Sequence, residues 1–394
     1  MLRSFSVKNF QSFREEARIS LELNMHAPAD GRSALADQGD RVSKVLAVIG
    51  PNGSGKTTLL KSLSFVNWFI KQSFQGRPDA LLPLDPHFVS PHEPSEFQVE
   101  FDMDGDIWRY DLSATPERVL AEALYRKQNR FSYVFIRTWD EGAKAYVVKQ
   151  QQFGMPPREA SKVRPNASLI STAAQFGVNL ASRMMDMWVF SNVTVLGRSH
   201  MMDHEQILLA SDLYAHNDEY QSQMSRLLSQ WDLGLSSVKL VKQELTDTAG
   251  EKREIHVPYG VHTIRGKEHQ LILMQESSGT QGAFTLLSRV LPVLSSGGLA
   301  LIDELEADLH PHMLVPILDL FFSKKTNPYN AQIVFTTHAI DVMHQLHKGQ
   351  IVLVEKNADC ESDAWRMDEI KGIRADENLY AKYMAGAYGA VPQL

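Results

Sequence analysis

The chain has few of the features that mark secreted, membrane or disulfide-built proteins. Its 394 residues contain one cysteine, Cys360, which excludes an internal disulfide framework and a zinc site built from several cysteines. No run reaches the roughly 18 uninterrupted apolar residues of a membrane helix, since the most apolar stretch, residues 286–302, is broken by Arg289, serines and glycines. The N-terminus also lacks the apolar core of a secretory signal. We therefore expect a cytoplasmic protein without a membrane contact.

The chain also has no excess of positive charge, since 47 Asp and Glu residues outnumber 40 Lys and Arg residues and the formal net charge is −7. A chain whose whole surface wraps nucleic acid is normally basic, so any such contact must come from a local patch, a partner or a dimer groove. Arg158, Lys162 and Arg164 form one small basic cluster, which is either a solvated loop or a contact for a phosphate backbone. No segment sustains three or four heptads, which argues against a long coiled coil.

Strand and helix patterns divide the chain into three parts and predict an α/β fold. Residues 1–150 contain a buried strand at 45–49, a following helix, and antiparallel strands over 97–148 with a helical interruption near Glu117 to Tyr125. Residues 151–235 are expected to form a helical insertion whose one strong strand is NVTVL at 192–196. In residues 236–394 strands alternate with helices, which favours a largely parallel sheet covered by helices.

A glycine-rich segment between the buried strand and its helix predicts a phosphate-binding loop. It matches G-x-x-x-x-G-K-[ST] in full. Its glycines let backbone N–H groups approach phosphate oxygens, and the helix that follows presents its positive end to an anion. Lys56 supplies a charge for the β- and γ-phosphates of ATP, and the Thr57 hydroxyl is a ligand suited to Mg²⁺. The predicted nucleotide-binding residues are Gly50, Pro51, Asn52, Gly53, Ser54, Gly55, Lys56, Thr57 and Thr58.

Two carboxylates follow the apolar run 299–302. Strand ends of a parallel sheet line its ligand crevice, so Asp303 should lie beside the phosphate loop and hold Mg²⁺. Glu304 can accept a proton from an attacking water or orient it. Taken alone the pair could be a surface strand end, but the phosphate loop earlier in the chain favours the catalytic interpretation.

Two further segments are ambiguous on their own. Ser277, Ser278 and Gly279 open a helix, where small hydroxyl residues are ordinary N-caps. His338 ends the buried run 331–337, where a histidine is often only packed or exposed.

Their order and spacing, however, resemble an ABC-type ATPase of the branch that includes SMC and RecF proteins. The resemblance implies that Ser277, Ser278 and Gly279 of one subunit close on the ATP held by another. It also implies that His338 contacts the γ-phosphate, and that Asp308 and His310 lie in a loop spanning the dimer. The segment departs from the LSGGQ form, with Glu276 in place of leucine, Ser278 in place of the first glycine and Thr280 in place of glutamine.

Two elements of the ABC pattern stay unassigned. Gln75 and Gln98 are both candidates for the family's glutamine loop. Gln11 stands where arginine is frequent near the adenine, which leaves Arg3, Lys8 or Arg14 for that role.

Several segments together narrow the resemblance to abortive-infection ATPases, including RloA-like proteins and the ATPase parts of OLD-type and PARIS-like defence systems. They are SVKNFQSF, GPNGSGKT, FDMDGDIWRYDL, RPNASLISTAAQFG, ESSGTQ, LIDELEADLHP and YMAGAYGAVP. The sequence ends at residue 394, which leaves no room for the nuclease domain of OLD proteins, so we expect a separate effector protein.

The resemblance implies an ATPase that works as a homodimer, or a higher assembly of dimers, and regulates that effector. Two alternatives stay open: a RecF- or SMC-like DNA-repair ATPase, and a nucleotide-gated scaffold with little turnover.

Overall fold

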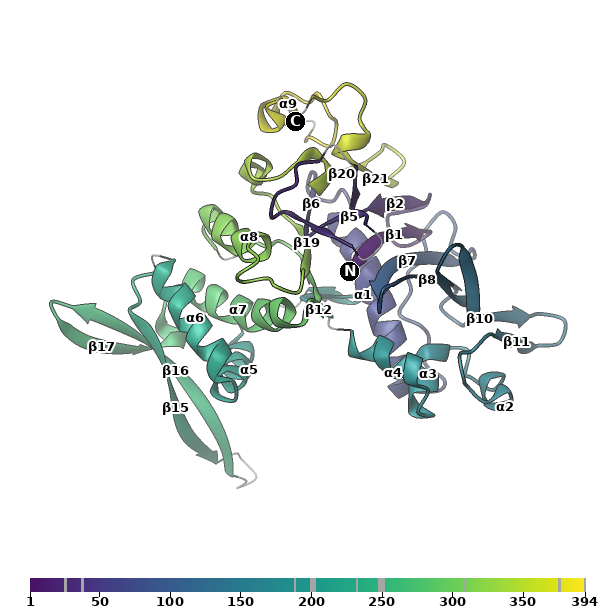
Figure 1. The fold of residues 1–394 in the computed structure, drawn as a ribbon, viewed down its shortest axis with the longest axis horizontal. Coiled ribbons are helices and arrows are strands. Elements are labelled where there is room, and N and C mark those ends of the chain that lie inside the picture. Colours follow the sequence, from purple (N-terminus) through teal and green to yellow (C-terminus); the bar gives the residue numbers. More distant parts are fainter. Residues whose placement is uncertain are drawn as a thin grey trace.

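The computed structural model describes residues 1–24, 27–36, 39–187, 189–198, 203–231, 233–246, 252–307, 309–374 and 377–392. Its centre is a mostly parallel sheet in the order β12-β18-β19-β6-β20-β21, in which only the β20–β21 pair is antiparallel (Figure 1). The strands are β12 (Val189–Ser191), β18 (Leu299–Ile302), β19 (Gln332–Thr336), β6 (Val45–Ile49), β20 (Ile351–Lys356) and β21 (Ser362–Arg366).

The central sheet is buried on both faces because alternate residues of its strands enter two different hydrophobic cores. Leu46 and Val48 of β6 pack into one core, whereas Val45, Ala47 and Ile49 pack into the other. This period of two, with both sides apolar, explains why β6 lacks polar alternation. The first core includes residues of helix α1 (Lys56–Gln72), and the second includes residues of α7 (Ser278–Ser296) and α8 (Leu314–Phe322).

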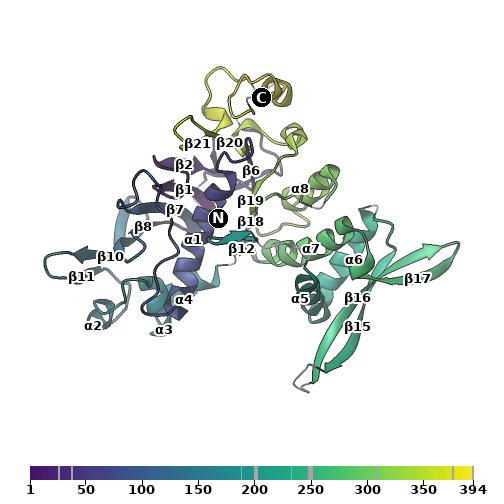
Figure 2. The ribbon, with the colours of Figure 1, turned by 180° about the vertical axis from the view of Figure 1, so that it is seen from behind.

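An antiparallel sheet in the order β11-β10-β9-β8-β7-β1-β2 contributes to the first core and faces α1 (Figure 2). Its strands are β1 (Leu2–Lys8), β2 (Ala17–Ser20), β7 (Ser95–Met103), β8 (Asp106–Ala114), β9 (Val119–Lys127), β10 (Phe131–Asp140) and β11 (Ala145–Gln150). Close to the same side lie α2 (Pro157–Ala160), α3 (Leu169–Gln175) and α4 (Asn179–Asp186).

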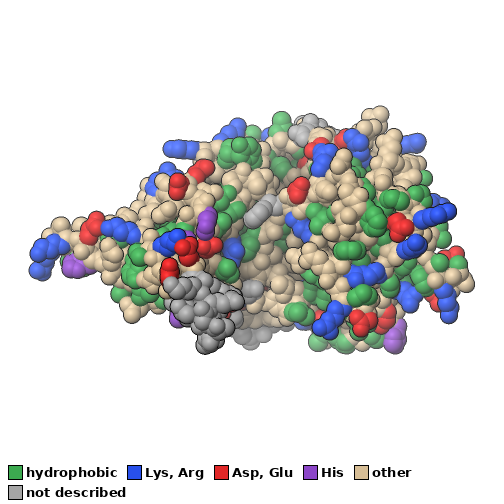
Figure 3. All heavy atoms as spheres, turned by 90° about the horizontal axis from the view of Figure 1, so that it is seen from below, with side chains coloured by type: hydrophobic (Ala, Val, Ile, Leu, Met, Phe, Trp, Pro, Cys, Tyr) green, Lys and Arg blue, Asp and Glu red, His purple; other side chains and the backbone are tan. Residues whose placement is uncertain are grey.

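A second lobe projects from the opposite side of the central sheet (Figure 1). It combines α7 with α5 (His204–Ala215), α6 (Asp218–Gln230) and an antiparallel sheet of β15 (Ser237–Thr246), β16 (Lys252–Ile264) and β17 (Lys267–Ile272). In the view from below, the surface is hollowed between this lobe and the rest of the molecule, and acidic and basic side chains are interspersed (Figure 3).

Short elements complete the chain, and no helix among the described residues is long and apolar enough to cross a membrane. The remaining strands are β3 (Glu22–Leu23), β4 (Ser33–Leu35), β5 (Arg41–Ser43), β13 (Val193–Thr194) and β14 (Gly197–Arg198). The remaining helices are η1 (Ser73–Gln75), η2 (Leu273–Gln275), η3 (Pro311–Met313), η4 (Ile340–His344), η5 (Lys348–Gln350), η6 (Met367–Glu369) and α9 (Leu379–Met384).

The helical interruption predicted near Glu117 to Tyr125 is wrong, because the segment from Val119 on lies in β9, between β8 and β10. Its Leu, Ala and Glu residues favour a helix locally, but two neighbouring strands supply its hydrogen bonds. The side chain of Glu122, completely buried, faces Arg137 of β10. Tertiary pairing therefore overrides the local preference.

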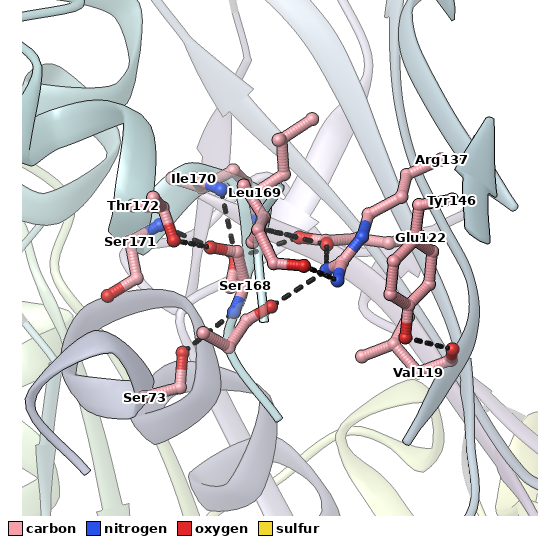
Figure 4. Close-up of polar contacts among 12 residues, drawn as sticks. Ser73, Val119, Glu122, Arg137, Tyr146, Ser168, Leu169, Ile170, Ser171 and Thr172 are labelled. Carbon is pink, nitrogen blue, oxygen red and sulfur yellow. Dashed lines mark hydrogen bonds and ion pairs between the residues drawn. The ribbon is translucent and has the colours of Figure 1, made fainter. Parts of the chain in front are cut away.

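The Glu122–Arg137 pair belongs to a buried polar network that joins β9 and β10 to the segment before α3 (Figure 4). The Arg137 guanidinium donates to the carbonyls of Val163, Arg164 and Ala167 at 2.7–2.9 Å. Glu122 accepts from the Ser168 hydroxyl at 2.7 Å, and the same hydroxyl caps α3. Buried charges of this kind persist only when paired and hydrogen-bonded, so the network fixes where α3 begins.

Residues 151–235 are shared between the two sides of the molecule. Helices α3 and α4 are separated by a turn at Gly177, which has a φ of +72°. Residues of α3 and α4 pack in the first core, while those of α5 and α6 pack in the second. The expectation that NVTVL is the one strong strand here is wrong, because β12 precedes it and pairs with β18. The division into 1–150, 151–235 and 236–394 stays a prediction.

Candidate functional site

The phosphate loop connects β6 to α1 and depends on glycine at both ends. A Cβ on Gly50 would lie 2.1 Å from the carbonyl oxygen of Val354, so no side chain fits there. Gly55 has a φ of +112°, and a Cβ on it would lie 2.5 Å from the Ser362 hydroxyl. Gly53 also has a positive φ but faces open space. The loop is therefore held tightly against β20 and β21, while its middle stays accessible.

Lys56 is the first residue of α1, and its ammonium group hydrogen-bonds to the backbone of the loop. Its Nζ donates to the carbonyl oxygens of Gly50 at 2.8 Å and Pro51 at 2.9 Å. Burial lowers the pKa of Lys56, an effect that the nearby carboxylates of Asp303 and Glu304 oppose. Among the described residues this buried ammonium donates to two neutral carbonyls, so a bound phosphate would supply it with a directly hydrogen-bonded negative charge.

Asp303 leaves the end of β18 and meets the first turn of α1. Its carboxylate accepts from the Thr57 hydroxyl at 3.0 and 3.1 Å and from the Thr336 hydroxyl at 2.8 Å. Asn192, directly after β12, fixes the Asp303 backbone by donating to its carbonyl at 3.1 Å and accepting from its N–H at 2.8 Å. The structure thus brings the predicted metal ligands Thr57 and Asp303 together, and their oxygen donors suit Mg²⁺.

Glu304 has an unusual backbone and an ionic partner. Its φ is +50°, in the left-handed region where a residue other than glycine is uncommon. Its N–H donates to the Thr336 hydroxyl at 2.7 Å. The Glu304 carboxylate forms an ion pair with Arg198 of β14. The strained backbone changes the direction of the Glu304 side chain at the end of the strand, and the ion pair with Arg198 holds its carboxylate.

These groups line one cavity of about 330 Å³ beside the phosphate loop. Its buried Ser54 hydroxyl has no hydrogen-bond partner among the described residues. His338 lies at the mouth, exposed, and its backbone N–H donates to the carboxylate of Glu306. The lining residues are Gln11, Ser12, Asn52, Gly53, Ser54, Gly55, Lys56, Thr57, Thr58, Asp303, Glu304, Thr336, His338 and Lys356. Glycine-opened backbone, an ammonium, hydroxyls and carboxylates together fit a polyphosphate with a divalent cation.

The serine-glycine segment lies at the start of α7 and does not line this cavity. Ser277 caps the helix, because its hydroxyl accepts from the N–H of Thr280 at 3.2 Å. Ser277 and Ser278 are exposed, and none of Ser277, Ser278 and Gly279 lines the cavity of the same chain. Glu276 points back to β16, where it accepts from His262 at 2.7 Å, and this pair raises the pKa of His262.

Other sequence candidates lie elsewhere. Neither Gln75 nor Gln98 is among the described lining residues, whereas Gln11 is, and its amide oxygen accepts from Thr58 at 3.2 Å. Arg3 is buried and is bound by the carboxylates of Glu22, Asp40 and Asp102, so it does not reach the cavity.

The remaining sequence candidates that the structure describes do not line the cavity either. Arg14 pairs with Glu361, and Lys8 is not a lining residue in the described part of the chain. Arg164 of the small basic cluster donates to three backbone carbonyls near η1. Asp308 lies outside the described residues, and His310 caps η3.

Sequence reasoning missed Asn192, Arg198 and Lys356. Lys356 ends β20, whose first four residues are buried, so the rule that selected Asp303 could have selected it. Asn192 follows β12, whose three residues are too few to show the period of a strand. Arg198 follows a turn and carries no comparable local signal.

Comparison with solved structures returned SMC head domains at low sequence identity. The SMC head bound to the C-winged helix domain of ScpA has a TM-score of 0.48 and 13% identity, covering 94% of this chain and 99% of that one. The SMC head from Thermotoga maritima has a TM-score of 0.44 and 14% identity, covering 93% and 98%. The SMC head with an extended coiled coil bound to the C-terminal domain of ScpA from Pyrococcus furiosus has a TM-score of 0.44 and 12% identity, covering 93% and 97%. No curated protein matches the chain.

A family model does match, over residues 45–343, and it begins at β6 before the phosphate loop and ends after His338. The fold is α/β, with a phosphate loop between β6 and α1 of a mostly parallel sheet and with an antiparallel β lobe. The chain belongs to the family described as "AAA domain, putative AbiEii toxin, Type IV TA system".

Proposed function

We propose that the chain binds ATP with Mg²⁺ in the cavity beside the phosphate loop and hydrolyses it to ADP and phosphate. The observation that carries the proposal is the convergence of Lys56, Thr57, Asp303, Glu304 and His338 on one cavity, although they come from three separate parts of the sequence. Such a set matches what phosphoryl transfer needs: positioning of the phosphates and stabilisation of their charge.

Each group has a role that its position supports. Loop N–H groups and the Lys56 ammonium hold the phosphates, while Thr57 and Asp303 hold Mg²⁺, which neutralises phosphate charge when bound. The Glu304 carboxylate accepts the proton of the attacking water once it is free of Arg198. His338 stands at the mouth, where its imidazole can contact the terminal phosphate.

We place Ser277, Ser278 and Gly279 of a second copy over this cavity, in a head-to-tail homodimer. Two observations support this arrangement: Ser277 and Ser278 are exposed at a helix N-terminus, and they do not line the cavity of their own chain. A helix N-terminus presents unpaired N–H groups and a positive dipole end, which suit a terminal phosphate.

Nucleotide binding and turnover test the site directly. Lys56→Ala should abolish ATP retention at millimolar magnesium, because the loop then lacks its only charge. Lys61→Ala, one turn along α1 and not among the lining residues, is the matched control and should retain ATP. Glu304→Gln should keep binding while turnover falls by about 10²–10⁴-fold, the usual worth of a positioned base. Unchanged turnover in Glu304→Gln would remove that residue from the mechanism.

For the biological role, we propose a regulatory ATPase of an anti-phage defence system that acts with a separate effector, as in RloA-like or PARIS-like systems. The family description, which names a toxin of type IV toxin–antitoxin systems, supports a role in conflict or growth control. Phage infection of cells carrying the locus, with the intact chain or with Lys56→Ala, tests this role. Equal phage yield in both strains would contradict it.

A nucleotide-gated scaffold with little turnover is the second candidate, and the Arg198–Glu304 ion pair favours it. A base held by an arginine is slow to accept a proton until that arginine moves. Turnover measured with and without DNA separates both candidates from a RecF- or SMC-like repair ATPase, whose turnover should respond to DNA.

A further inference from the structure

We propose that Asp212, His216 and His256 form a binding site for a divalent transition-metal ion, best suited to Zn²⁺, in the second lobe. Each residue offers one ligand atom, and the three atoms lie within 4.8 Å of one another. The site is separate from the phosphate cavity, and the inference does not depend on ATP hydrolysis.

The spacing of the ligands is already close to what a metal requires. The Nδ1 atom of His256 lies 3.1 Å from Oδ1 of Asp212, and Nδ1 of His216 lies 3.5 Å from the same oxygen. Zinc bonds to nitrogen and oxygen of about 2.0–2.2 Å in a tetrahedral site place two ligand atoms roughly 3.4 Å apart. Nδ1 of His216 now donates to the Asp212 backbone carbonyl at 2.8 Å, so this ring must turn from that carbonyl before the two imidazoles can close around one ion and fill three of its four positions.

Two independent elements supply these ligands. Asp212 and His216 are four residues apart at the end of α5, a spacing that places both on one face of a helix. His256 comes from β16, which packs against α5, and its side chain is 19% exposed. The two rings are nearly perpendicular, with centroids 5.6 Å apart, so both ring edges can face a shared point.

Local electrostatics favour a cation there. Asp212 lies in the last turn of α5, and the C-terminal end of a helix dipole repels a carboxylate but attracts a positive ion. Lys242, opposite His256 in the β15–β16 pairing, is engaged with Glu254 at 2.8 Å. Two imidazole nitrogens and one carboxylate oxygen are a donor set that Zn²⁺ prefers, with a fourth position left for water.

Occupation would tie α5 to β16 at one point. The same strand carries His262, which holds Glu276 directly before the Ser277 cap, and Tyr214 of α5 donates to the Phe284 carbonyl of α7. The metal would therefore stiffen the lobe that presents the start of α7.

Metal binding to the full chain tests the site. Titration with Zn²⁺ alone, and with Co²⁺ as a coloured probe, should show one tight equivalent that is lost in His256→Gln and in Asp212→Asn. Since second-shell changes already cost about 10–100-fold in affinity, removing a ligand should cost about 100-fold or more. His269→Gln, an exposed histidine on β17 of the same lobe, is the matched control and should bind as the unchanged chain does.

Thermal unfolding gives a second readout, because an ion that binds only the folded chain raises its melting temperature, and the rise grows with the logarithm of the ion concentration relative to Kd. Zn²⁺ should raise the melting temperature of the unchanged chain and of His269→Gln, and not that of Asp212→Asn. Equal affinity in Asp212→Asn, His256→Gln and the control, or no tight equivalent in the unchanged chain, would overturn the proposal.

Discussion

At the scale of single residues, Arg198 is the side chain whose role is easiest to measure. It pairs with Glu304, and both side chains are partly exposed, at 25% and 40%. Exposed ion pairs contribute about 0.2–1 kcal/mol, and 1 kcal/mol corresponds to roughly a fivefold change in rate. If the pair restrains the base, Arg198→Ala should raise steady-state ATP turnover by up to about fivefold.

The control for this change is Arg183→Ala, which removes a surface ion pair with Asp104 in another part of the molecule. It should leave turnover unchanged. A fall in turnover in Arg198→Ala would show that Arg198 supports the reaction instead of restraining Glu304.

The residues of the site differ in how far the sequence predicts them. Lys56 and Thr57 stand in a contiguous motif, and Asp303 follows a buried run, so local pattern is sufficient to place them at a strand end. The contact of Arg198 with Glu304 joins positions 106 residues apart, and that of Asn192 with Asp303 joins positions 111 apart. No local pattern encodes such contacts, because they depend on β12 joining the sheet beside β18.

At the scale of elements, the buried network around Glu122 should control how the segment before α3 attaches to β9 and β10. Glu122→Ala leaves the Arg137 charge buried without its partner, which should lower the free energy of unfolding by about 3–5 kcal/mol. Asp106→Ala, which removes the partner of the half-exposed Arg126, should cost at most about 1 kcal/mol. Urea unfolding of both variants measures these losses in the free energy of unfolding. An equal loss in the two variants would contradict the role given to the network.

Strands were predicted correctly where the hydrophobic pattern was clear, and wrongly where the preference of the residue types disagreed with the pairing of strands in the fold. The run VLAVI has no polar position, so β6 could be predicted as a buried strand. The run VLAEALYRK favours a helix by residue type, yet pairing with β8 and β10 makes it β9. The short β12 has three residues, too few for any period to show.

At the scale of the whole molecule, one sheet separates two cores, and each core carries half of the proposed composite site. The first core includes residues of α1, which follows the phosphate loop, and the second includes residues of α7, which begins at the Ser277 cap. The alternation of strands and helices predicts this layered α/β arrangement. The lobe that projects with α5, α6 and β15–β17 could not be placed from the pattern, because its position depends on contacts with α7.

The central claim is that one copy holds the nucleotide and another caps it, and mixing two defective chains tests it most directly. Lys56→Ala lacks a working phosphate loop, and Ser277→Arg blocks the cap; each should be inactive alone. In a head-to-tail dimer, half of randomly paired dimers contain both chains and have one intact site of two. The mixture should therefore recover about one quarter of the original ATP turnover if the sites act independently. A mixture as inactive as its components would contradict a site shared between two copies.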